Sequence, residues 1–495
     1  MTDDNSFDYV VVGGGTAGCI VAKRIAEETN SSVVLLEAGP SDAGIDQILD
    51  LRRWSELLGG AYDYDFTIEH QSRGNSDIRH SRGRMLGGCS SHNSCIAFVP
   101  PASDFEPWGP GWELPALRPY FDKVFERVNL EKGRTDNEFS RDFIDASVAA
   151  GYDEIDFGKP FAKGVGWLYL NKRDTQRESS SVAYLHSSGS DEPHPTVVSN
   201  ASAHRLVFDG ARAIAVETSQ GTFHAGKEVI LSCGAFGTPH LLMLSGIGPA
   251  AHLAQFDISC LFNLEGVGQN LRDHPEGVIT WGLKKPLPQE TIQKYEVAVF
   301  DRIDPDAVWP DIMFHMGLEP FGMCTEPKGF NTPEHGFSMT PNITRARSRG
   351  NIQLRSGDPA VHPRIDFQYY TDPEGYDERI MVEGIRRARA IVEHSPLKPW
   401  IDFEAAPGPD ITSFSEVSEF VRGTGNTVYH PAGSCAMGSE TDLHTVVDTN
   451  LRVRGIDNLR IADASVFPNH VSVNPNMTVM MIAERCADLV TNRTQ

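Results

Sequence analysis

The chain has 495 residues, 40 % of them hydrophobic and 22 % charged, a composition typical of a water-soluble enzyme long enough for two cores. Its formal net charge of −23 repels phosphate backbones, which argues against nucleic-acid binding and suits a cationic substrate. No apolar run approaches the roughly 20 residues of a membrane span, and residues 1–8 are too acidic for a signal or transit peptide, so we expect a cytoplasmic protein.

The first forty residues predict a strand–helix–strand unit. Residues 7–12 form an apolar run suited to a strand buried on both faces, and residues 13–18 form a glycine-rich turn. Helical periodicity follows over residues 17–28, and a second buried strand spans residues 32–36.

Further along, the pattern predicts a second layer of structure. Residues 61–94 read as a long functional loop, followed by helices over 115–129 and 138–152 and by short strands over 196–232. Strand-like stretches at 278–283, 312–316 and 352–356 indicate an antiparallel sheet, with helices over 374–393 and 476–490. We therefore predict an α/β fold of two interleaved domains, one spanning 1–150, 190–275 and 428–495 and the other spanning 151–189 and 276–427.

The eight cysteines are scattered. None belongs to a CxxC pair, and no Cys/His cluster has the spacing of a zinc site. We expect buried, reduced thiols and no metal.

The first motif is Gly13-Gly14-Gly15-Thr16-Ala17-Gly18, which fits G-x-G-x-x-G between a strand and a helix. Such a turn lets a pyrophosphate approach the helix N-terminus, and Glu37 ends the next strand where a carboxylate can meet a ribose. The motif predicts dinucleotide binding without separating FAD from NAD.

Three other clusters carry candidate chemistry. Residues 82–93 combine glycines and serines with His92, which by itself is typical of a hydrogen-bonded loop histidine. Residues 234–248 read as a strand–helix joint whose helix starts near Pro239. His430 and Asn474, 44 residues apart, suit proton transfer if folding brings them together.

Together these clusters resemble the glucose–methanol–choline (GMC) oxidoreductase family, and the resemblance runs from about residue 7 to residue 490. It implies a Rossmann-type FAD-binding domain interleaved with an α+β substrate domain on an antiparallel sheet, as in the GMC and PHBH-like folds. The residues it assigns to the cofactor are Gly13, Gly15, Thr16, Ala17, Gly18, Glu37, Arg84, Gly87, Gly88, Ser91, His92, Asn93, Asp463, Ala464, Asn474 and Pro475.

Within the family, residues 87–98, 273–277, 426–431 and 478–489 resemble the choline-oxidising members. This likeness implies that His92 is bonded covalently to the flavin, which reverses its bland interpretation. It further implies that Glu276 faces a trimethylammonium group inside an aromatic cage of Trp54, Tyr295 and Tyr429. A quaternary ammonium donates no hydrogen bond and is best held by ring faces and a carboxylate.

The remaining roles follow from the same likeness. His430 and Asn474 are implied as the catalytic pair, with Ser94 and His315 near the substrate oxygen and Val428 near the place where O2 reacts. The implied reaction is choline oxidation to betaine aldehyde and glycine betaine with release of H2O2, in a homodimer. Two departures bear on the substrate. Tyr295 stands where choline oxidisers have tryptophan, and the segment 129–163 is shorter than in those relatives.

Three alternatives stay open. One is an oxidase or dehydrogenase for a different primary alcohol, in which Glu276 and Tyr295 serve another polar group. A second is a hydroxynitrile-lyase-like relative without net redox chemistry. The third is a flavin-binding protein without catalysis, which fits an intact His/Asn pair poorly.

Overall fold

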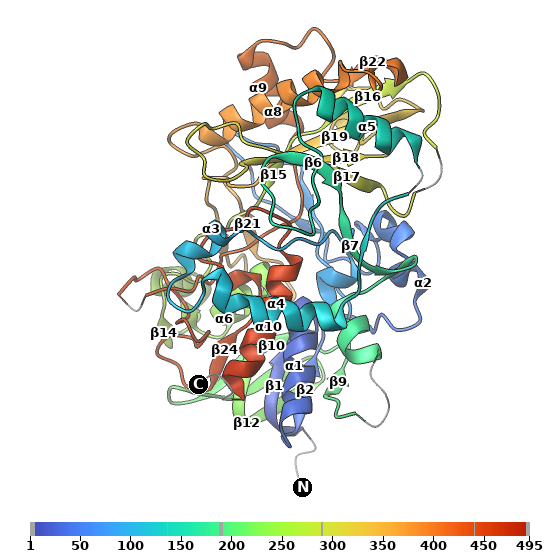
Figure 1. The fold of residues 1–495 in the computed structure, drawn as a ribbon. Helices are drawn as coiled ribbons and strands as arrows, with labels where there is room; N and C mark the ends of the chain where they lie inside the picture. The colour runs from blue at the N-terminus through green and yellow to red at the C-terminus, as the bar shows by residue number, and fades with distance from the viewer. Residues whose placement is uncertain (1–4, 136, 188–191, 289–290, 440, 492–495) are drawn as a thin grey trace.

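Two sheets, each assembled from distant stretches of the chain, form the two halves of the molecule (Figure 1). The computed structural model describes residues 5–135, 137–187, 192–288, 291–439 and 441–491. Helices α1 and α10 lie in the lower half of Figure 1, whereas α5, α8 and α9 lie in the upper half. The predicted α/β fold with interleaved nucleotide-binding and antiparallel layers is confirmed.

The lower sheet has seven strands in the order β10-β11-β12-β1-β2-β9, and β24 pairs with β12. Its bounds are β1 Ser6–Val12, β2 Val33–Leu36, β9 Thr196–Val198, β10 Ala203–Asp209, β11 Arg212–Thr218, β12 Gly221–Leu231 and β24 Leu459–Ile461. The five strands β9, β2, β1, β12 and β24 pair in parallel. Helix α1 (Thr16–Glu28) packs with α10 (Asn476–Val490), which also contacts α4 (Leu114–Arg127).

The upper sheet has eight strands and is antiparallel throughout, in the order β22-β16-β19-β18-β17-β6, with β15 paired to β19 and β23 paired to β15. Its bounds are β6 Gly164–Trp167, β15 Pro275–Glu276, β16 Ile279–Leu283, β17 Tyr295–Asp301, β18 Ile312–Gly317, β19 Gly336–Ile343, β22 Ile401–Ala406 and β23 Asn426–Thr427. Helix α8 (Tyr376–Val392) packs on β18 and β19 and is covered by α9 (Phe414–Thr424).

Short elements fill the connections. They are α2 Asp46–Leu49, α3 Ala102–Phe105, α6 Gly234–Leu244, α7 Ala250–Leu253, β3 Phe66–Thr67, β4 Arg79–His80, β5 Leu130–Lys132, β7 Tyr169–Arg173, β8 Gln176–Arg177, β13 Ile247–Gly248, β14 Phe262–Asn263, β20 Asn351–Gln353 and β21 Arg364–Asp366. Residues 61–94, predicted as a long loop, contain only β3, β4 and a 3₁₀ turn at Gly88–Ser91.

Two local predictions were wrong. The strand expected over residues 352–356 is β20, and it pairs with β21 in a two-stranded sheet instead of joining the large antiparallel one. The helix expected to start near Pro239 is α6, which starts at Gly234 and holds Pro239 inside it. A proline has no N–H for the carbonyl four residues earlier, and here the Ser434 hydroxyl donates to Ala235 O at 2.5 Å in its place.

Sheet membership suggests a change to the first predicted domain boundary. Helix α5 (Glu138–Ala149) packs against β6, β17 and α8, all in the upper half, although the predicted boundary at residue 150 puts it with the nucleotide fold. We propose that the first boundary lies between α4 and α5.

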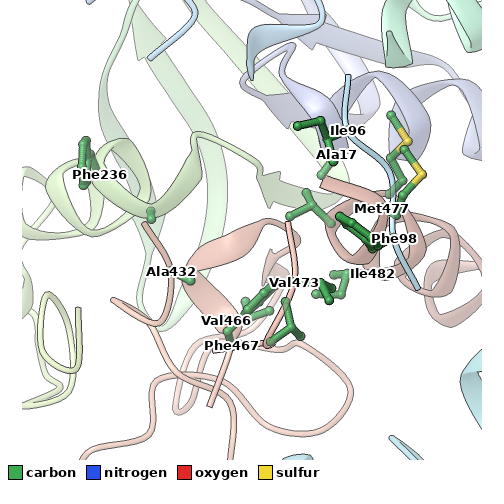
Figure 2. Close-up of a cluster of buried hydrophobic side chains, with 14 of the residues drawn as sticks. Ala17, Ile96, Phe98, Phe236, Ala432, Val466, Phe467, Val473, Met477 and Ile482 are labelled. Atoms are coloured by element: carbon green, nitrogen blue, oxygen red, sulfur yellow. The ribbon is translucent and has the colours of Figure 1, made fainter. Parts of the chain in front are cut away.

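Apolar packing anchors the C-terminal segment beneath the site. Figure 2 shows Val466, Phe467 and Val473 between Ala432 and the start of α10, and all are buried. The chain carrying Asn474 is therefore held in the core on both sides. In the part of the chain that the structure describes, no helix is long and apolar enough to span a membrane, and no group of three or more metal-ligating side chains is found.

Candidate active site

A cavity of about 400 Å³ lies between the two sheets. Val12, Leu36 and Ser232 bring it the carboxyl ends of β1, β2 and β12, where parallel sheets bind ligands. Glu276, Tyr295 and His315 reach it from β15, β17 and β18 of the antiparallel sheet. The cavity thus joins a nucleotide end to a substrate end.

The nucleotide end has the shape that a pyrophosphate requires. Helix α1 begins at Thr16 after Gly15, and no side chain caps its first turn, so its N–H groups stay available for an anion. A Cβ on Gly15 would meet nothing closer than 3.8 Å, which leaves room for a ligand against the backbone. Glu37 accepts from Gly14 N at 2.8 Å and from Gly39 N at 2.7 Å, and its burial raises its pKa to about 7.

Most predicted site residues line this one cavity. They are Gly13, Gly15, Thr16, Ala17, Glu37, Trp54, Gly88, His92, Asn93, Ser94, Glu276, Tyr295, His315, Val428, Tyr429, His430, Asp463, Ala464, Asn474 and Pro475. The structure therefore brings together residues from positions 13 to 475, with buried polar atoms of Asn474, Asn476 and His315 left without a protein partner. These residues fit an extended dinucleotide such as FAD.

Four predicted cofactor residues do not line the cavity: Gly18, Arg84, Gly87 and Ser91. A Cβ on Gly18 would lie 1.9 Å from Gly13 O, so this glycine allows close contact of helix and strand. The Ser91 hydroxyl donates to Asp42 Oδ2 at 2.9 Å, within a buried polar cluster.

His92 is buried in the cavity wall after the 3₁₀ turn. Its Nε2 lies 3.2 Å from Leu57 O and 3.5 Å from Asp63 Oδ2. Hydrogen bonds and charge from His92 hold the pKa of Asp63 below its usual range, although burial of the carboxyl acts in the opposite direction. These contacts fix the imidazole ring at the cavity.

The protonation pattern of His430 follows from its neighbour His274. His274 Nε2 lies 3.0 Å from Val471 O, and because a carbonyl oxygen only accepts, this nitrogen carries the hydrogen. Burial lowers the pKa of both histidines well below 6.5, so both rings are neutral and His274 Nδ1 is an acceptor. His430 Nδ1 lies 3.0 Å away and donates to it. His430 Nε2 is consequently left with its lone pair, as a base requires.

The side-chain amide of Asn474 lies next to the lone pair of His430 Nε2. Its amide Nδ2 lies 3.3 Å from His430 Nε2 and donates to it, while its Oδ1 is buried without a protein partner. Folding therefore brings together the predicted pair.

His315 presents a donor to the same space. Asn342 Nδ2 donates to Met313 O at 3.1 Å and lies 3.4 Å from His315 Nδ1, so Nδ1 accepts and Nε2 carries the hydrogen. Burial lowers the pKa of His315 to about 4, and its Nε2 is buried without a protein partner. A neutral N–H donor thus faces the cavity near the His430 base.

Aromatic rings line the substrate end of the cavity together with Glu276. The Trp54 and Tyr295 ring centres are 5.8 Å apart, and Tyr295 stacks on Phe321 at 5.9 Å. Burial raises the pKa of Glu276 to about 8, against the opposite effect of Thr340 and Asn426. Among the described residues no cationic side chain forms an ion pair with Glu276.

Several supporting residues escaped the sequence reasoning. His274, Asp273 and Asn342 set the orientation of the catalytic histidines: Asp273 Oδ1, for example, accepts from His430 N at 3.0 Å. The only signal in the sequence was the Asp273-His274 pair beside Glu276, because the His430 and Val471 partners of this pair lie more than 100 residues away.

Two family models, both described as GMC oxidoreductase, match residues 7–276 and 346–483. The choline oxidase of Arthrobacter globiformis is 44 % identical over 98 % of this chain and 94 % of its own length. Human mitochondrial choline dehydrogenase is 32 % identical over 98 % of this chain and 90 % of its own length. Among solved structures, a pyridoxine 4-oxidase (named for Mesorbium loti) has a TM-score of 0.88 at 28 % identity, covering 97 % of this chain and 98 % of the other.

Proposed function

The chain belongs to the GMC oxidoreductase family and is an FAD-dependent oxidoreductase of alcohol donors, and from that premise we propose that it is a choline oxidase. One observation carries the substrate assignment: a buried carboxylate, Glu276, without a cationic partner among the described residues, stands beside Trp54, Tyr295 and Tyr429 in the cavity that holds His430. A quaternary ammonium alcohol matches both groups of residues. Its cation binds to the carboxylate and the aromatic ring faces, and its hydroxyl donates a proton to the base.

The residues around the hydroxyl perform the proton chemistry. His430 Nε2 takes the hydroxyl proton, since its tautomer is set by the bond from its Nδ1 to His274. The N–H of His315 stabilises the oxygen as it becomes negative, and the second N–H of the Asn474 amide, whose first N–H is directed at His430 Nε2, assists it. FAD, when bound, would supply the acceptor for the hydride of the alcohol carbon, with O2 as the final electron acceptor and H2O2 as its product.

The same site accommodates the second oxidation. Betaine aldehyde keeps the trimethylammonium group, and its hydrate again presents a hydroxyl to His430. We therefore expect glycine betaine as the final product, with two O2 consumed for each choline.

We also propose that His92 is the covalent attachment point of the flavin. The ring is held in the cavity wall by Leu57 and Asp63, as a fixed attachment requires. Acid precipitation should leave the yellow colour in the pellet, and His92→Asn should release it to the supernatant. A colourless pellet from the unmodified protein would contradict the linkage.

Oxygen uptake with choline beside 3,3-dimethylbutan-1-ol, its uncharged near-isostere, tests the substrate. We expect a clear preference for choline that Glu276→Gln removes, at flavin content equal to that of the unmodified protein. Equal activity on the two alcohols would sink the quaternary-ammonium site. Turnover with a dye but not with O2 would instead assign the chain to the dehydrogenases, to which it is 32 % identical.

A further inference from the structure

A second cavity, of about 590 Å³, lies behind the catalytic histidine and shares no lining residue with the first. Four arginines line it: Arg272, Arg345, Arg347 and Arg349. This local excess of positive charge is unusual in a chain whose formal net charge is −23.

Two of these arginines are placed opposite each other by the backbone. Leu271 and Gly350 form an antiparallel bridge, with N···O distances of 3.0 and 2.8 Å in the two directions. In such a pair the next residues along the two strands, Arg272 and Arg349, are directly opposite with side chains on the same face. Like charges in that position repel unless an anion lies between them.

The carboxylates of the cavity are already engaged. Asp104 Oδ1 accepts from Arg345 at 2.7 Å, and Glu374 pairs with Arg347. Asp372 accepts from the backbone N–H groups of the first two residues of α8, at 2.5 and 3.2 Å.

Arg272 and Arg349 have no carboxylate partner among the described residues. The Arg272 guanidinium donates from Nε to Asn270 Oδ1 at 3.1 Å, and within the described part of the chain neither arginine forms an ion pair. Burial of Arg272, together with the nearby charge of Arg349, lowers the pKa of Arg272 to about 10. A half-buried guanidinium close to a second positive charge is stabilised by a counter-ion.

We propose that this cavity is a binding site for a small oxyanion, a phosphate or a carboxylate, held between Arg272 and Arg349. Paired guanidinium groups match the oxygens of either group, and charge-assisted bonds of this kind are stronger than neutral ones.

The site is joined to the catalytic histidine by a short stretch of backbone. Arg272 exchanges two backbone hydrogen bonds with Ala432, at 2.9 and 3.0 Å, and stands two residues before His274, which contacts His430. From the other side His470 lines the arginine cavity and lies 2.6 Å from His430 O through its Nε2. An anion there contacts the elements that orient the base.

Calorimetric titration of the flavin-loaded protein with sodium phosphate and with sodium acetate, at ionic strength matched with NaCl, tests the site without any substrate. We expect saturable binding of one anion per chain, weakened about tenfold or more in Arg349→Gln and lost in the double variant Arg272→Gln/Arg349→Gln. Arg118→Gln, at an exposed arginine that pairs with Asp122 on α4, should bind like the unmodified protein.

The choice of anion identifies the ligand class: tighter binding of phosphate assigns a phosphate site, and tighter binding of acetate assigns a carboxylate site. A response to both anions no larger than the response to chloride, or one that persists in the double variant, would overturn the proposal. Because Arg349 is exposed, Arg349→Gln should fold even if the substitution of the half-buried Arg272 does not. The titration is independent of choline turnover, so the two proposals fail separately.

Discussion

At the scale of single residues, Glu276 combines burial with the lack of an ion-pair partner among the described residues, and this makes choline binding depend on pH. Its pKa is raised to about 8 by burial, so below that pH the empty site holds a neutral acid. A cationic substrate favours the carboxylate, and binding therefore requires release of a proton. In the proposed binding mode, Glu276 is charged in the empty site only above its own pKa.

We expect the KM for choline to fall as the pH rises from 6 towards 8, by up to about tenfold per unit, and then to level off. The uncharged 3,3-dimethylbutan-1-ol should lack this dependence, and so should Glu276→Gln acting on choline. Steady-state oxygen uptake at pH 6 to 9 measures all three. An identical pH profile for the two alcohols would assign the titration to another group and contradict this role.

The sequence predicts the residues that face the ligands better than the residues that orient them. His430, Asn474 and Glu276 lie in sequence motifs that can be recognised from the amino-acid sequence alone. His274 could not be assigned in this way, because its meaning depends on Val471 O and His430 Nδ1, which only the fold brings within 3.0 Å. Tautomers are set by such distant contacts and leave no local pattern.

At the scale of elements, the joint between β1 and α1 depends on a backbone contact that only glycine permits. A Cβ at Gly18 would stand 1.9 Å from Gly13 O, a clash with backbone that no side-chain movement relieves. We expect Gly18→Ala to displace α1 from the pyrophosphate position, to cost about 1–3 kcal/mol of stability and to lower flavin content. Gly423→Ala, in α9 with nothing within 4 Å of its Cβ, is the matched control and should leave both unchanged or slightly improved.

The absorbance ratio of flavin to protein after dialysis and the thermal midpoint measure both variants. Full flavin content in Gly18→Ala would show that the helix tolerates the shift.

The periodicity of apolar residues identified the long helices and strands, because the buried face of such an element must be apolar. Strand β1 and helix α10 match their predicted bounds to within a residue, since each buries a continuous apolar surface. The assignment of residues 352–356 failed because a short apolar strand has the same pattern in a large sheet and in the two-stranded pair β20–β21. The apolar pattern indicates that a strand is buried, whereas the strand with which it pairs depends on the topology of the fold.

At the scale of the whole molecule, the interleaving of the two halves was visible in the order of motifs, because nucleotide-binding segments occur near both termini. The exact position of the first domain boundary could not be predicted from the sequence, because the amphipathic pattern of α5 fits either sheet. In the structure α5 packs on β6 and β17. Such a helix is assigned by the surface that it covers and not by its own sequence.

Net charge is the property of the whole chain that bears most directly on the proposed substrate. With 67 acidic and 44 basic residues, the protein attracts cations to its surface and raises their concentration at the cavity mouth. The effect is screened as the Debye length shrinks from about 30 Å at 0.01 M salt to about 3 Å at 1 M.

We therefore expect kcat/KM for choline to fall several-fold, on the order of threefold, between 10 mM and 500 mM NaCl, with kcat little changed. The uncharged 3,3-dimethylbutan-1-ol provides the matched control, because it fills the same site without responding to the field. Oxygen uptake in a buffer free of phosphate and carboxylate keeps the arginine cavity out of the measurement. An equal fall for both alcohols would point to a salt effect on the enzyme itself, and a rise for choline would mean that the negative field hinders its approach.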